Sequence, residues 1–134
     1  MIVDDVGDIR ALMSLLLKGC GLEVLEAGSG ADALRLASES GCPDLVVMDL
    51  QMPDMDGWSA IRALRQICSS DRMAVVVCSV KAQDEHADGR AGGPVDSYIQ
   101  KPFANAAFVE TITSLVALTP TQRRALREQG RKRR

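Results

Sequence analysis

The stretch VMDLQMPDMDG, residues 47–57, joins an apolar run to an acidic turn. The apolar run begins at Leu45 and ends on Asp49, and it has the length and residue types of a buried strand. A carboxylate that is buried without a partner is unstable and normally takes up a proton. The position of Asp49 therefore indicates a strand whose last side chain is kept charged by groups from elsewhere in the chain.

The rest of the chain alternates short apolar runs with stretches of helical spacing. Strand-like runs occupy residues 1–3, 22–27, 44–49, 73–78 and 95–99. Apolar residues at helical spacing follow Gly7 and follow Ser29, which is a candidate helix cap. The same spacing covers about 58–67 and 104–118. Such alternation predicts an α/β domain with a parallel sheet and right-handed crossovers. At 134 residues, the chain is expected to form one such domain.

The segment between the fourth and fifth predicted strands fits this pattern poorly. It reads KAQDEHADGRAGGP, residues 81–94, and it contains no large apolar side chain. Gly89, Gly92 and Gly93 each destabilise a helix by about 1 kcal/mol relative to alanine. We therefore predict a short, mobile or partly unwound fourth helix, with His86 as a surface residue.

Composition argues against several classes of function. Aromatic residues make up 3% of the chain, so stacking on nucleic-acid bases is not expected. No apolar run approaches the roughly 20 residues of a membrane span, and acids at positions 4 and 5 do not fit a secretory signal. The cysteines form no C-x-x-C pair and are expected to be reduced thiols in the cytoplasm. They are Cys20, Cys42, Cys68 and Cys78.

Polar side chains follow four of the predicted strands. The first ends on Asp4 and Asp5, the third on Asp49 and the fourth on Ser79, and Lys101 follows the fifth. The carboxyl ends of parallel strands share one edge of the sheet, so these groups are expected to meet there. Three carboxylates repel one another unless a cation lies among them, and Mg²⁺ suits an all-oxygen site. Asp49 is then a candidate nucleophile that forms an acyl phosphate.

These motifs resemble the receiver domain of bacterial two-component response regulators. The matching stretches are Asp-Asp at 4–5, DLQMPDMDG at 49–57, Cys-Ser at 78–79 and YIQKPF at 98–103. The resemblance covers roughly residues 1–118. It implies a flavodoxin-like, doubly wound sheet of five parallel strands in the order 2-1-3-4-5, with five helices, as in single-domain chemotaxis receivers.

The resemblance also implies a magnesium site. Asp49 is the expected phosphoacceptor, and Asp5 and Asp49 are the expected direct ligands of a Mg²⁺ cofactor. Asp4 is expected to act through water. The backbone carbonyl of Gln51 is expected to complete the protein's share of the metal shell.

Further roles follow from the same resemblance. Lys101 is expected to bind a phosphoryl oxygen and to precede a cis bond to Pro102. Ser79 is the expected switch hydroxyl, and Tyr98 is the aromatic side chain expected to change rotamer with it. Val80 stands where the family favours alanine or glycine, so we expect slower access to the site. The first strand is also shorter than the family's usual one.

The implied partners are proteins. A histidine kinase or a histidine phosphotransfer protein is expected to supply the phosphoryl group. A downstream protein is expected to bind the face made by the fourth helix, the fifth strand and the fifth helix. The chain is expected to be a cytoplasmic phosphoprotein of a phosphorelay. Direct DNA binding and a membrane span are not expected, and whether the chain forms a homodimer stays open. It is not expected to be an enzyme beyond its own phosphoryl transfer and dephosphorylation.

Two alternatives belong to other functional classes. The first is an interaction module with the same fold whose site is not phosphorylated in use. The second is a phosphatase of the haloacid dehalogenase type, which also uses an aspartate nucleophile. That class needs an acid two residues after the nucleophile, and Gln51 occupies this position after Asp49.

Residues 119–134 form a basic tail that follows the receiver domain, 1–118. The tail holds seven Lys/Arg and one Glu, although the whole chain has a net charge of −2. Thr119, Pro120 and Gln122 fit a capping box, which predicts a short helix to about residue 129 and then disordered chain. The start of the tail is similar to the entry of a LuxR-type helix-turn-helix, but no recognition helix follows. A solvated tail, or one docking on an acidic partner, a membrane surface or a nucleic acid, stays open.

Overall fold

The five predicted strands form one parallel sheet. The structure is a computed structural model that describes residues 1–69, 71–80 and 93–132. The sheet has the order β2-β1-β3-β4-β5, which confirms the expected doubly wound topology. Its strands are β1 (Ile2–Val3), β2 (Glu26–Ala27), β3 (Leu45–Asp49), β4 (Ala74–Ser79) and β5 (Ser97–Gln100). The second strand is shorter than the predicted range 22–27.

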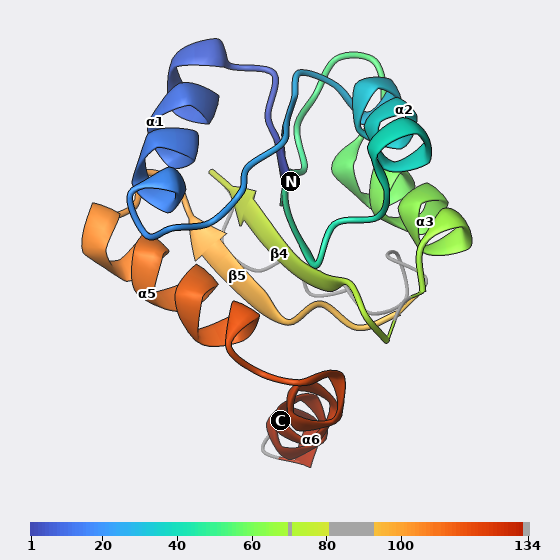
Figure 1. The fold of residues 1–134 in the computed structure, drawn as a ribbon, viewed down its shortest axis with the longest axis vertical. Coiled ribbons are helices and arrows are strands. Elements are labelled where there is room, and N and C mark those ends of the chain that lie inside the picture. The colour runs from blue at the N-terminus through green and yellow to red at the C-terminus, as the bar shows by residue number, and fades with distance from the viewer. Residues whose placement is uncertain (70, 81–92, 133–134) are drawn as a thin grey trace.

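Helices cover both faces of the sheet (Figure 1). One face carries α1 (Gly7–Lys18) and α5 (Asn105–Val116), and the other carries α2 (Gly30–Ser40) and α3 (Gly57–Ile67). The central strands β3 and β4 are buried along their whole length, as expected for strands covered on both faces. This packing leaves the two ends of the strands as the places where polar groups gather.

The two core layers follow from the alternation of side chains along these strands. Val46 and Met48 point toward α2 and α3, where they join the layer that contains Trp58. Val47 lies on the opposite face, in the layer that contains Phe108. Both layers are aliphatic apart from these few rings, as the composition predicts.

One predicted element lies outside the described residues. The fourth helix was expected within 81–94, and the structure does not describe residues 81–92. The prediction of a weak helix and of a surface position for His86 therefore stays a prediction.

The acidic turn after β3 is held by its own side chains. Asp56 caps α3, because its Oδ1 accepts a hydrogen bond of 2.9 Å from the Ser59 amide. A Cβ on Gly57 would collide with the carbonyl oxygen of Asp49, so a larger residue would have to displace the chain there. Ser29 caps α2 in a similar way, by accepting from the Asp32 amide at 3.1 Å, as predicted.

The basic tail is a helix that extends further than predicted. The helix α6 spans Pro120–Lys132, and Thr119 and Gln122 form the expected capping box through reciprocal hydrogen bonds of 2.8 and 3.2 Å. The helix lies beyond the amino ends of β4 and β5 (Figure 1). The expectation of disordered chain after residue 129 is therefore wrong for the described part of the tail.

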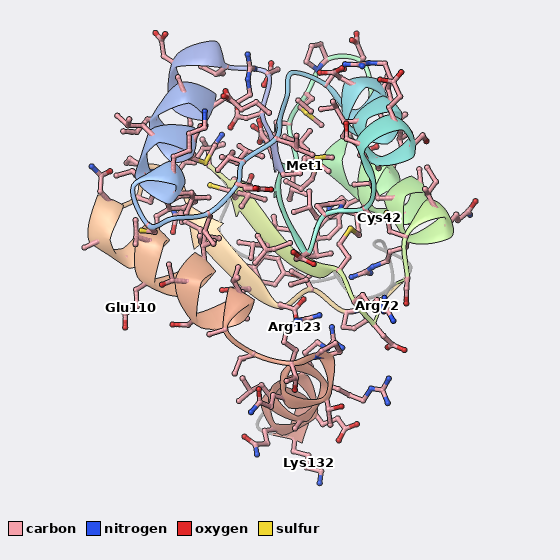
Figure 2. The ribbon with its side chains drawn as sticks, in the orientation of Figure 1. Met1, Cys42, Arg72, Glu110, Arg123 and Lys132 are labelled. Carbon is pink, nitrogen blue, oxygen red and sulfur yellow. A yellow bond between two sulfur atoms is a disulfide. The ribbon has the colours of Figure 1, made fainter. Side chains whose placement is uncertain are left out.

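Arginine side chains of α6 bind the body of the domain. Arg123 is 5% exposed and donates hydrogen bonds to the carbonyls of Leu118, Asp71 and Arg72 at 2.8–3.1 Å (Figure 2). The interpretation of the tail as solvated chain is wrong at this position. Periodicity did not reveal the contact because it is made by an arginine rather than by an apolar stripe.

Two ion pairs extend this contact. Arg127 pairs with Asp96 at 3.2 Å, with side chains only 11% and 2% exposed, while Arg124 pairs with Asp71 on the surface at 2.9 Å. Asp96 also accepts a hydrogen bond from the Val75 amide at the start of β4. We name these interactions the α6 contact: Arg123, Arg124 and Arg127 with Asp71, Arg72 and Asp96.

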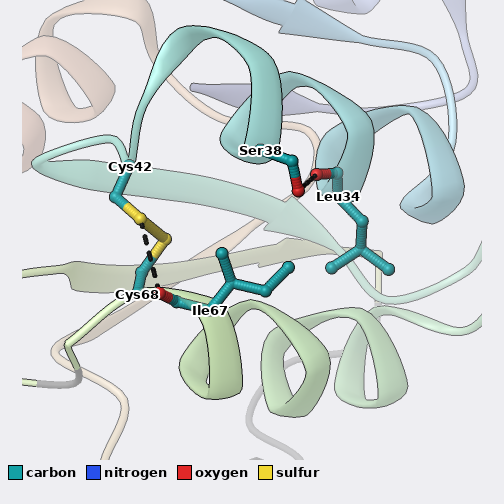
Figure 3. Close-up of a disulfide and its surroundings, with 5 residues drawn as sticks. All are labelled: Leu34, Ser38, Cys42, Ile67 and Cys68. Atoms are coloured by element: carbon teal, nitrogen blue, oxygen red, sulfur yellow. Dashed lines mark hydrogen bonds between the residues drawn. A yellow bond between two sulfur atoms is a disulfide. The ribbon is translucent and has the colours of Figure 1, made fainter.

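A disulfide joins the loop before β3 to the end of α3. Cys42 and Cys68 are bonded, with their Cα atoms 5.6 Å apart, and the Cys42 sulfur also lies 3.9 Å from the Ile67 carbonyl (Figure 3). The prediction of reduced thiols is therefore wrong for this pair. The spacing of the two cysteines along the sequence does not indicate this disulfide, since the packing of α2 beside α3 brings them together. Cys20 and Cys78 are free.

Among the described residues, no helix combines the length and the apolar character that crossing a membrane requires.

Candidate functional site

Three carboxylates meet at the carboxyl edge of the sheet, as predicted. Asp4 and Asp5 follow β1, and Asp49 is the last residue of β3. One oxygen from each lies within 4.8 Å of the other two. Asp4 and Asp49 are buried, whereas Asp5 is exposed. We name these residues the acid cluster, and its open side is the side of Asp5.

Lys101 is the cation beside the acid cluster. Its Nζ lies 2.6 Å from Oδ2 of Asp4 and 3.7 Å from Oδ2 of Asp49, and its side chain is 10% exposed. Burial lowers the pKa of Lys101, but the hydrogen bond and charge of Asp4, together with the charge of Asp49, outweigh it and leave the pKa above its usual value. The lysine is therefore charged, and its shorter contact is with Asp4 rather than with Asp49.

Asp49 is held in an environment that disfavours its charge. Burial raises its pKa, and the charges of Asp4 and Asp5 raise it further. The amide of Gln51, which donates to Oδ1 at 3.1 Å, and the charge of Lys101 oppose this without cancelling it. The site thus contains more negative charge than Lys101 can neutralise.

The acid cluster fits a magnesium ion. All of its donor atoms are carboxylate oxygens, which are the ligands that Mg²⁺ prefers. A dication would also remove the repulsion that raises the pKa of Asp49. Asp4, Asp5 and Asp49 are the side chains that would hold it. The expectation that the backbone carbonyl of Gln51 also binds the metal ion stays a prediction.

The two expected switch residues lie on the strands next to the site. Ser79 ends β4 and is 2% exposed, and its carbonyl accepts a hydrogen bond of 2.8 Å from the Lys101 amide. Tyr98 is half-buried on β5, opposite Val77. The bond from Lys101 to Pro102 is cis, as expected. A coupled movement of Ser79 and Tyr98 stays a prediction.

Cys78 lies beside the site without competing for its chemistry. It is buried and pairs in register with Asp49 across β3 and β4. Burial raises the pKa of its thiol to about 11. The thiol is therefore protonated at neutral pH and is a poor nucleophile there.

One residue of the site was missed at the level of sequence. Arg10, on α1, donates a hydrogen bond of 2.6 Å from Nη1 to the backbone carbonyl of Asp4. The available signal was a lone arginine in the first turns of the helix that follows the acid pair. It was passed over because helix arginines are usually surface residues.

A cavity lies at the opposite edge of the sheet. It has a volume of about 470 Å³ and is lined by Leu22, Asp44 and Val116, among others. Its size alone does not make it a functional site, since the carboxylates and the lysine converge at the other edge.

Comparisons with known proteins agree with this geometry. The response regulator receiver domain family matches residues 1–113. The chemotaxis protein CheY of Bacillus subtilis is 34% identical over 84% of this chain and 92% of its own length. A CheY-like receiver domain protein of Methanospirillum hungatei superimposes with a TM-score of 0.73 and 32% identity, over 87% of this chain and 94% of its own.

Other relatives are longer proteins. The transcriptional regulatory protein PrrA of Mycobacterium tuberculosis is 36% identical over 87% of this chain but only 48% of its own length. The chain thus spans about half of that relative. The match to the family, the sheet order and the acid cluster agree, and the chain belongs to the response regulator receiver domain family of two-component systems.

Proposed function

We propose that the chain is a phosphoacceptor switch that takes a phosphoryl group onto Asp49 in a Mg²⁺-dependent reaction. The observation that carries the proposal is the convergence of three carboxylates and a charged lysine from separate segments at one edge of the sheet. The donor is a phosphohistidine on a histidine kinase or a phosphotransfer protein. The chain would act in the cytoplasm, where the Cys42–Cys68 disulfide would have to resist reduction. It would catalyse only its own phosphoryl transfer and dephosphorylation.

The carboxylate of Asp49 is oriented for attack on phosphorus. The Gln51 amide fixes Oδ1, and the Lys101 ammonium faces Oδ2. A new oxygen–phosphorus bond forms as the phosphorus–nitrogen bond of the donor breaks, and the imidazole nitrogen keeps the electron pair and gains a proton. A bound Mg²⁺ supplies charge neutralisation for the phosphoryl oxygens.

Lys101 links the new phosphoryl group to the strands beside it. A phosphoryl group adds a charge of about −1.5 to −2 and three acceptor oxygens, which would compete with Asp4 for the ammonium. The Lys101 amide donates a hydrogen bond to the Ser79 carbonyl, so a movement of Lys101 would also move the end of β4. The output is a changed surface around β5 and α5 that binds a downstream protein, and phosphorylation could also drive homodimer formation.

An intact-mass measurement tests the proposal. The protein is incubated with Mg²⁺ and a small phosphodonor, with and without a chelator. We expect the mass of one added phosphoryl group, lost in Asp49→Asn and in the chelated sample. Asp54→Asn, which changes an exposed acid of the same turn, is the matched control and keeps the addition.

The same measurement separates the second candidate function, an interaction module that works without phosphorylation. The absence of any mass addition, under conditions where a control receiver is labelled, would favour that module and contradict the phosphoacceptor. An addition that persists in Asp49→Asn would place the reaction on another residue.

A further inference from the structure

Arg10 connects the acid cluster to two neighbouring segments. Its Nη1 donates to the Asp4 carbonyl at 2.6 Å, and its Nε lies 3.6 Å from Oε1 of Glu26, the first residue of β2. The guanidinium also lies against Gly28, since a Cβ there would stand 3.4 Å from Nη1. The side chain is 25% exposed. One arginine of α1 thus contacts the loop after β1, the start of β2 and the turn after it.

The hydrogen bond from Arg10 completes the set of contacts around Asp4. The Asp4 amide donates to the Ala27 carbonyl at 3.1 Å, and Oδ1 accepts from the Val6 amide at 2.9 Å. Oδ2 accepts from Lys101, and the carbonyl accepts from Arg10. Asp4 is 0% exposed, so a carbonyl that lost Arg10 would be hard for water to reach.

The position of Asp4 decides the position of its neighbour. Asp5 follows Asp4 directly and is the exposed carboxylate of the acid cluster. A rotation of the peptide between them would move both carboxylates relative to Asp49. The contact made by Arg10 is on the carbonyl of this peptide, so it opposes that rotation.

We propose that Arg10 is a positioning residue of the divalent-cation site. Its hydrogen bond holds the peptide between Asp4 and Asp5 in the orientation that presents both carboxylates to a cation, and Glu26 offsets the charge of the guanidinium. The inference rests on the proposed function, because it assumes that the acid cluster binds Mg²⁺. It adds a residue that contacts neither the cation nor the phosphoryl group.

A bystander arginine and a positioning arginine predict opposite results. Removing a nearby positive charge that did nothing else would lower the repulsion toward a cation and tighten Mg²⁺ binding. Removing a group that holds the ligands in place would weaken binding, and the loss of such outer contacts costs about tenfold in metal affinity. The sign of the change therefore decides between the two.

Titration calorimetry of the full chain with Mg²⁺ alone provides the test. We expect Arg10→Gln to raise the Kd about tenfold. Arg10→Lys should recover part of the loss, because an ammonium can still donate to the carbonyl. Arg35→Gln is the matched control: it removes the same charge from α2, where Arg35 pairs with Asp32 and Glu39, and it should leave the Kd unchanged.

A second variant covers the case in which Arg10→Gln does not fold. Arg10→Lys keeps the positive charge, so a bystander arginine predicts an unchanged Kd. A positioning arginine predicts a raised Kd, because one ammonium cannot contact both the Asp4 carbonyl and Glu26 as the guanidinium does. Thermal unfolding without metal serves as the measure of folding, and an effect on stability alone would leave the Kd of a folded variant unchanged.

The outcomes are distinct. An unchanged or lower Kd in Arg10→Gln, with wild-type protein that binds Mg²⁺ and is phosphorylated, overturns the role of Arg10 and leaves the proposed function standing. Wild-type protein that does not bind Mg²⁺ at all overturns the proposed function and this inference together.

Discussion

The two edges of the sheet hold buried charges in different ways. At the carboxyl edge, the acid cluster sets three carboxylates against one ammonium, that of Lys101. At the amino edge, the buried charges of the α6 contact have partners within the protein: Asp96 accepts from an amide and from Arg127, and Arg123 donates to three carbonyls. Carboxylates that repel one another mark the edge that fits a cation. Charged side chains that already have protein partners mark the edge that contributes to stability.

The edges also differ in what connects their segments. The amino edge carries a covalent bond, Cys42–Cys68, close to the α6 contact along the chain, since Asp71 and Arg72 follow Cys68 within a few residues. The segments of the carboxyl edge are joined by hydrogen bonds and ion pairs of Asp4 and Lys101. In the proposed reaction, contacts of this kind would exchange partners when a phosphoryl group arrives, whereas the amino edge would provide a fixed base.

The largest expected effect concerns the disulfide at the fixed edge. It closes a loop with a sequence separation of 26. Chain entropy then gives a stabilisation of about 3.5 kcal/mol. We expect the paired substitution of Cys42→Ser and Cys68→Ser to lower the free energy of unfolding by about that amount in urea titrations. Alkylation followed by intact mass, with and without a reductant, checks that the bond exists.

The control for this prediction is Cys20→Ser, which changes an exposed free thiol and should leave stability unaltered. The alkylation is done in denaturant, so that buried Cys78 also reacts. Wild-type protein in which all four cysteines then react before reduction would contradict the bond and the fixed character of this edge.

A smaller effect is expected in the α6 contact. Arg123→Met removes hydrogen bonds to three carbonyls and should destabilise the protein by about 2 kcal/mol. Arg124→Met, which breaks an ion pair whose side chains are 59% and 61% exposed, should cost less than about 0.5 kcal/mol. Urea unfolding of both variants gives the comparison. Equal effects would mean that α6 does not dock through Arg123, and a changed Mg²⁺ affinity would mean that the two edges are not independent.

The carboxyl edge could be predicted from the sequence because its residues occupy strand ends. Three apolar runs end on Asp4, Asp49 and Ser79. Once the strands are known to be parallel, these polar residues must lie at the same edge of the sheet. The same rule located Lys101, because this residue follows the end of the fifth predicted strand. The partner choice of Lys101, closer to Asp4 than to Asp49, depended on packing distances that no pattern contains.

The amino edge could not be predicted because its contacts do not follow a period. Arg123 binds backbone carbonyls, which every residue possesses, so nothing in the sequence identifies its acceptors. Cys42 and Cys68 meet only because α2 packs beside α3. Arg10 belongs to the same class, since its acceptor is the carbonyl of Asp4. Side chains that bind backbone are visible only when the fold is known.

An effect smaller than those of the disulfide and Arg123 tests whether the carboxyl edge is unbalanced without a cation. The pKa of Asp49 is raised in the folded protein, so over the range from its ordinary value of 3.8 to the raised value the folded state binds more protons than the unfolded chain. Stability contributed by this group is therefore lost as pH rises through that range. In a chelator, Asp49→Asn should be more stable than wild type by about 1 kcal/mol at neutral pH.

Both pH and Mg²⁺ should change this difference in a defined direction. The advantage of Asp49→Asn should shrink below pH 4, where the wild-type carboxyl is protonated in both states. Added Mg²⁺ should reverse it, because a cation that binds only the folded protein stabilises wild type in proportion to RT ln(1 + [Mg²⁺]/Kd). Thermal unfolding at several pH values, with chelator or with Mg²⁺, measures all three. A substitution that destabilises the chelated protein at neutral pH would show that Lys101 already balances the acid cluster, and the contrast between the edges would then fail.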